Sequence, residues 1–111
     1  MADLTAMYDQ ADRLKDEGKY EEAIDKLNEV LSEDPHYVLA HLALAVLFGR
    51  VSKHEEAVRH GQKACELEPD DAFNFTAMSV TYQRAFAATR NADYIPLAED
   101  AMARAHALQQ R

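Results

Sequence analysis

The stretch GKYEEAI, residues 18–24, recurs as SKHEEAV at residues 52–58, and the two copies are 34 residues apart. The dipeptide Asp34-Pro35 recurs as Glu68-Pro69 at the same offset. Two separate segments with one offset are hard to obtain by chance, so the chain contains an internal repeat. Repeats of this length are single supersecondary units that bury a core by stacking on their neighbours.

One unit reads as a helix, a short turn and a second helix. Met7, Ala11 and Leu14 are spaced by three and four residues, as on the apolar face of an amphipathic helix. Gly18 ends that helix because glycine accepts a left-handed backbone, and Pro35 forbids continuation of the next one. The second helix has an apolar stripe formed by Ala23, Ile24, Leu27, Val30 and Leu31.

A third unit follows with irregular spacing. The segment 99–102 aligns with residues 21–24 at an offset of 78, whereas two regular repeats would give 68, so about ten residues are inserted near 84–94. We predict a single domain, 1–111, with repeats at about 4–37, 38–71 and 72–111. The expected helices are at about 4–17, 20–32, 37–51, 54–67, 71–90 and 95–110.

This pattern resembles the tetratricopeptide repeat (TPR) family, whose repeats place small, aromatic and proline residues at fixed positions. Gln10 and Gly61 depart from the family pattern. The resemblance implies an all-α, right-handed superhelix of three helix pairs that acts as a protein-binding scaffold. The small residues that would let paired helices approach are Ala11, Ala45, Ser79, Ala23, Ala57 and Ala101.

The net charge of −8 argues against nucleic-acid binding, because an acidic chain repels phosphate. The charge is uneven. Residues 1–36 carry eleven acids and four bases (net −7), residues 37–71 six and four (net −2), and residues 72–111 three and four (net +1). The acidic third is either a solvated capping face or a docking face for a basic partner.

Other sequence features indicate a cytoplasmic protein that does not bind membranes. The single cysteine, Cys65, excludes an intramolecular disulfide and fits a reducing compartment. The N-terminus does not read as a secretory signal. The longest apolar stretch, 38–48, is far shorter than the ~20 residues of a membrane span.

In the TPR family the first helix of each repeat lines a concave groove, and the resemblance implies such a groove here. It would have an apolar floor and an acidic N-terminal rim, and exposed apolar surface of this kind marks interaction sites. We therefore expect a scaffold that binds a partner helix or peptide in this groove. The groove residues are Tyr8, Asp12, Leu39, Leu42, Ala43, Val46, Phe73, Thr76, Ala77 and Val80, with Arg50 and Arg84 near one mouth.

Alternatives to an external partner remain open at this point. The occupant could be a second copy of the chain, which would make the protein a self-assembling module, or the chain's own ends. The apolar residues could also pack on one another in a tight superhelix. Arg50 and Arg84 could receive an acidic group of a partner or serve as ordinary helix-end arginines.

One TPR subfamily grips the C-terminal carboxylate of chaperone tails with Lys, Asn and Arg side chains. The corresponding positions here hold Tyr8, Asp12, Ala43, Phe73 and Ala77, and none of them matches. Asp12 would also repel a carboxylate. We therefore expect no chaperone-tail clamp.

No constellation for catalysis or cofactor binding is present in the sequence. His36 and His41 are five residues apart, as are His60 and Cys65, whereas metal ligands on a helix need a spacing of three or four. The histidines are expected to serve packing roles, and Cys65 is expected to be a buried small apolar residue. We expect neither an enzyme nor a cofactor.

Overall fold

The structure is a computed structural model that describes residues 3–111. It confirms the predicted all-α fold, because those residues form six α-helices and no strand. Every predicted helix is found within one residue of its expected ends. The helices are α1 (Leu4–Asp16), α2 (Tyr20–Glu33), α3 (Val38–Arg50), α4 (His54–Leu67), α5 (Ala72–Thr89) and α6 (Tyr94–Gln109).

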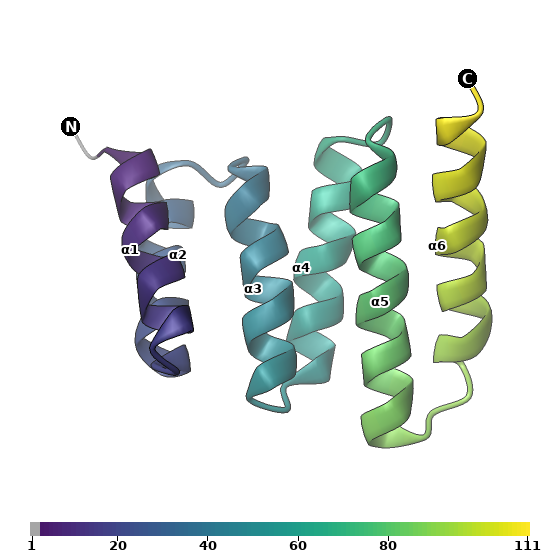
Figure 1. Cartoon of the computed structure of the whole chain (residues 1–111), viewed down its shortest axis with the longest axis horizontal. Helices are drawn as coiled ribbons and strands as arrows, with labels where there is room; N and C mark the ends of the chain where they lie inside the picture. Colours follow the sequence, from purple (N-terminus) through teal and green to yellow (C-terminus); the bar gives the residue numbers. More distant parts are fainter. Residues whose placement is uncertain (1–2) are drawn as a thin grey trace.

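Consecutive helices pack as antiparallel pairs, and the pairs stack along the longest dimension of the molecule. The first helices, α1, α3 and α5, follow one another across Figure 1, with α2 behind α1, α4 between α3 and α5, and α6 at the C-terminal end. The Cα atoms extend over 40 × 33 × 20 Å. The stack therefore has two ends, one formed by α1 and α2 and the other by α5 and α6.

The turns show why the repeat copies fold alike. Gly18 and Ser52, which are equivalent in the repeat, both have positive φ, at 78° and 65°. The left-handed residue lets the next backbone N–H reach back into the helix, so Lys19 donates to the Leu14 carbonyl and Lys53 to the Phe48 carbonyl. Asp71 begins α5 by accepting a hydrogen bond from the Phe73 N–H at 2.9 Å.

The core runs between the helix pairs, and one off-pattern residue is explained by it. Gly61 of α4 faces Met78 of α5, and a Cβ atom at Gly61 would lie 2.8 Å from the Met78 sulfur. Glycine thus makes room for a larger side chain from the next repeat. Gln10, the other off-pattern residue, is exposed on α1.

The third unit contains the longest helix. α5 has 18 residues, compared with 13 in α1 and α3, and it ends at Arg90 with a left-handed backbone (φ 60°).

The Cys65 thiol of α4 donates a hydrogen bond to the Asn74 carbonyl of α5 at 3.5 Å. Within residues 3–111, no helix is long and apolar enough to cross a membrane.

Candidate functional site

All twelve predicted groove residues lie on the first helices of the three pairs. We call the surface that they form the first-helix surface. On α3, Leu39, Leu42, Ala43 and Val46 are spaced by three, one and three residues, so they share one helix face. The buried residues Ala40, Leu44 and Leu47 lie on a different face of the same helix. Of the four predicted residues on α3, Ala43 packs against the core shared with the first pair, while Leu39 is exposed.

This surface carries most of the strongly exposed large apolar side chains. Leu39 is 51% exposed, Phe73 65% and Val80 36%. The two others in the described chain, Ile95 and Leu97, both lie on α6. Leu39 and Phe73 are 34 residues apart, so they occupy the same position in successive repeats. The remaining predicted apolar residues are half-buried, namely Leu42, Ala43, Val46 and Ala77, as is Thr76.

The surface is shallow where α1 meets α3. Tyr8, Asp12 and Ala43 border a depression of about 10 Å³ there, and Leu27 and Leu47 also line it. Such a volume holds about one water molecule. A ligand would therefore lie across the first-helix surface at this point and insert no large side chain.

The N-terminal edge of the surface is acidic. Asp9 and Asp12 are both exposed on α1, and Asp12 forms an ion pair with Lys15 at 3.1 Å. Burial raises the pKa of the Tyr8 phenol, and the neighbouring Asp12 carboxylate raises it further. Tyr8 thus presents a neutral hydroxyl beside this carboxylate.

The two arginines differ in their surroundings. The Arg50 guanidinium donates a hydrogen bond to the Tyr20 hydroxyl at 3.2 Å and lies 5.8 Å from the centre of its ring. Arg84 is exposed and forms no ion pair within residues 3–111. Arg50 therefore joins the first two repeats, while Arg84 is the arginine that remains accessible to a partner.

Two polar features escaped the sequence analysis. His41 and His60 contact each other through their ring nitrogens, although they are 19 residues apart. Asn74 is 1% exposed, and its amide donates hydrogen bonds of 3.3 Å to the carbonyls of Ala64 and Glu68 at the end of α4. No local motif marks either feature, because both depend on how successive pairs stack.

Cys65 lies at the same junction between the second and third pairs. Burial, with a smaller effect from Glu66, raises the pKa of its thiol to about 11. A neutral thiol is a poor nucleophile. Cys65 packs against the cluster of Met78 and Tyr82 as expected, but it is half-buried and not fully buried.

Comparisons with known proteins agree with this architecture. The TPR repeat family model matches residues 11–51. The second TPR domain of Spaghetti (RPAP3), solved with the HSP90 peptide SRMEEVD, has a TM-score of 0.78 at 21% identity, covering 95% of this chain and 91% of that one. MamA has a TM-score of 0.81 at 15% identity, and the alignment covers 96% of this chain and 58% of the MamA chain.

The first TPR domain of Spaghetti, also solved with the HSP90 peptide SRMEEVD, has a TM-score of 0.66 at 16% identity, with 97% of this chain and 94% of that one covered. No curated protein sequence matches the chain significantly. The three structures share 21% identity or less with this chain, so their likeness shows the fold alone.

Proposed function

We propose that the chain is a non-catalytic, cytoplasmic scaffold of the tetratricopeptide-repeat type, because its fold resembles TPR domains and the TPR family model matches residues 11–51. In this proposal the first-helix surface binds an amphipathic helix or peptide of a partner protein. TPR repeats are generally protein-interaction modules. Burial raises the pKa of the Cys65 thiol, and a thiol that stays neutral is a poor nucleophile.

The observation that carries the proposal is the row of exposed apolar side chains on α3 and α5. Leu39, Phe73 and Val80 are 51%, 65% and 36% exposed. Covering apolar area is favourable by ~25 cal/mol per Å², so a partner that covers these side chains gains several kcal/mol before the costs of association. A helix with one apolar face suits a shallow surface of this kind.

Charge supports a basic partner. Asp9 and Asp12 border the apolar row on the α1 side, and residues 1–36 together carry a net charge of −7. Arg84 lies at the far side, on α5. A peptide with a basic end over α1 would therefore bind more tightly than one with the opposite polarity.

A chaperone-tail peptide is a poor match for these side chains. Two proteins of similar fold were solved with an HSP90 peptide. The fold therefore does not support our expectation that this chain lacks a chaperone-tail clamp. The expectation rests on the side chains alone. Tyr8, Ala43 and Ala77 supply no cation at the positions concerned, and Asp12 repels the tail carboxylate.

Fluorescence anisotropy with two labelled peptides tests the proposal. One is a basic amphipathic helical peptide and the other is SRMEEVD. We expect the basic peptide to bind, SRMEEVD to bind at least tenfold more weakly, and Phe73→Glu to weaken binding of the basic peptide. Leu97→Glu, on an exposed side chain of α6, is the control. Equal binding by wild type and Phe73→Glu would refute the assignment of the surface.

A further inference from the structure

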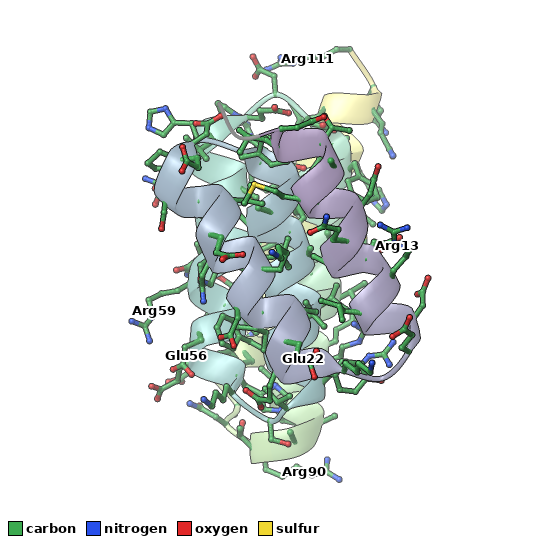
Figure 2. All side chains as sticks on the ribbon, turned by 90° about the vertical axis from the view of Figure 1, so that its left-hand side faces the viewer. Arg13, Glu22, Glu56, Arg59, Arg90 and Arg111 are labelled. Atoms are coloured by element: carbon green, nitrogen blue, oxygen red, sulfur yellow. The ribbon has the colours of Figure 1, made fainter. Side chains whose placement is uncertain are left out.

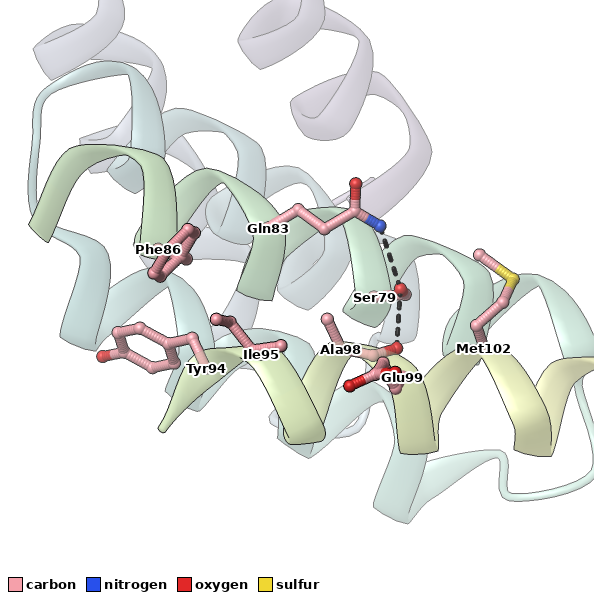
Figure 3. Close-up of a pocket in the computed structure, with 8 residues that line it drawn as sticks. All are labelled: Ser79, Gln83, Phe86, Tyr94, Ile95, Ala98, Glu99 and Met102. Carbon is pink, nitrogen blue, oxygen red and sulfur yellow. Dashed lines mark hydrogen bonds between the residues drawn. The ribbon is translucent and has the colours of Figure 1, made fainter. Parts of the chain in front are cut away.

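The C-terminal end of the stack carries a second apolar surface, separate from the first-helix surface. Its side chains line a hollow between α5 and α6 (Figure 3), and the volume of this hollow is about 490 Å³. Ile95 is 43% exposed there. We define this end face by Ser79, Gln83, Phe86, Ile95, Ala98 and Met102.

Inside the chain, the equivalent surface is covered by the next helix. Gly61 of α4 lies against Met78 of α5 and next to Ala45 of α3, and Val58 of α4 packs against the cluster that contains Met78. In the repeat, Ser79 corresponds to Ala45 and Met102 to Val58. The end face therefore has the form of a surface that receives a helix, and no helix covers it in the part of the chain that the structure describes.

Two polar side chains of the end face, Ser79 and Gln83, are bonded to each other, whereas Glu99, which also lines the hollow, is exposed to solvent. The Gln83 amide donates to the Ser79 hydroxyl at 3.1 Å, and this hydroxyl donates to the Ala98 carbonyl at 2.8 Å. The dashed lines in Figure 3 follow this chain of bonds from α5 to α6. Ser79 can therefore remain buried without a partner from outside, and burial of the face gains mainly from Phe86, Ile95 and Met102.

The N-terminal end of the stack is chemically different. Gln10 and Arg13 of α1 stand where α3 has Leu44 and Leu47, both of which the preceding pair buries. Figure 2 looks onto this end and shows Arg13 and Glu22 there. Placing this end on the end face of another copy would bury an amide and charged groups against apolar side chains, which is costly.

From these observations we propose that the end face binds the end face of a second copy, related by a two-fold axis. Such a contact is self-complementary and closes at two chains. It brings together the ends whose residues 72–111 carry a net charge of +1, and it leaves the two acidic thirds, each −7, at opposite extremes. The contact does not use the first-helix surface, so it stands independently of the proposed function.

Sedimentation velocity of the full chain over a hundredfold concentration range tests this proposal. The wild type is expected at twice 12.5 kDa, with no larger species at high concentration. Ile95→Glu is expected to raise the dimer dissociation constant at least tenfold, because it adds two carboxylates to a contact that already holds the two Glu99 side chains. Leu97→Glu is the matched control, since Leu97 is 40% exposed on the same helix but lies outside the end face and is expected to leave the dimer intact.

Circular dichroism melts establish that each variant is folded, and Met102→Lys supplies a second substitution on the end face. A wild type that stays monomeric at every concentration would overturn the proposal. So would a dimer that survives both substitutions. Species that grow beyond the dimer and are broken by Arg13→Glu would replace the two-fold contact with head-to-tail stacking.

Discussion

The Nδ1 atoms of His41 in α3 and His60 in α4 lie 3.0 Å apart. The Nε2 atom of His41 lies 2.8 Å from the Pro35 carbonyl oxygen, which can only accept, so Nε2 carries the proton and donates it. The hydrogen bond between the two Nδ1 atoms requires that one of them carries no proton, so at least one of the two rings must be neutral. His60 also stacks on Phe48, with ring centres 5.5 Å apart. The two histidines thus join α3 and α4.

This pair predicts that the protein loses stability in mild acid. Burial, and to a smaller extent the neighbouring His41, lowers the pKa of His60 from 6.5 to about 4. Since the unfolded chain binds a proton more readily, the contribution of His60 is complete above about pH 6.5 and is lost as the pH falls towards 4. Glu56 opposes this effect and Arg59 reinforces it.

The measurement is the thermal midpoint as a function of pH. Between pH 7 and 4.5 we expect the wild type to lose on the order of a few degrees more than His60→Gln, which removes the titrating group. His54→Gln, on a histidine outside the pair, is the control and should follow the wild type. Parallel curves for wild type and His60→Gln would show that the pair does not titrate in this range.

Asn74 predicts a second stability effect. Its amide donates to the Ala64 and Glu68 carbonyls at the end of α4, and each carbonyl also accepts a backbone N–H, from Glu68 and Asp71 respectively. Asn74→Ala removes two buried hydrogen bonds between α4 and α5 and should cost about 1–3 kcal/mol of unfolding free energy. Urea denaturation measures this value. Asn28→Ala, on an exposed residue of α2, should change it by less than about 0.5 kcal/mol, and equal losses in the two variants would contradict this role of Asn74.

At two glycines within helices, Gly49 and Gly61, we expect substitution by alanine to have opposite effects on stability. At Gly49 an added Cβ would meet no atom within 4 Å, so Gly49→Ala should stabilise the protein by about 0.5–1 kcal/mol through helix propensity. At Gly61 the same Cβ would lie 2.8 Å from the sulfur of the buried Met78. Gly61→Ala should therefore be less stable than Gly49→Ala by roughly 1–3 kcal/mol in urea denaturation. Equal values would mean that Met78 moves aside freely.

The sequence predicts the helices well because their ends are locally encoded. Gly18, Pro35 and the 34-residue offset locate the turns without any knowledge of packing. Contacts between repeats are less accessible, because they depend on the rotation of each helix. His41 and His60 are 19 residues apart, and no periodicity pairs them. The half-burial of Leu42 and Val46, compared with the exposure of Leu39 on the same helix, likewise follows from stacking.

The acidic edge of the first-helix surface supplies the last prediction. If a basic amphipathic peptide binds across α1, α3 and α5, then Asp9→Asn combined with Asp12→Asn should weaken its binding several-fold at low salt. The loss should shrink at high salt, because exposed charges are screened within about 3 Å at 1 M ionic strength. Phe73→Glu should weaken binding at both salt concentrations, since it disrupts apolar contact.

Anisotropy titrations at the two salt concentrations separate these contributions. Glu29→Gln combined with Glu33→Gln on α2 is the charge-matched control, because it also removes two exposed carboxylates from the acidic third but lies away from the first-helix surface. An equal loss in this control and in the Asp9 and Asp12 variant would mean that the peptide responds to the net charge of the chain. A loss confined to the α1 aspartates would place its basic end over α1, which in turn places its apolar face over Leu39 and Phe73.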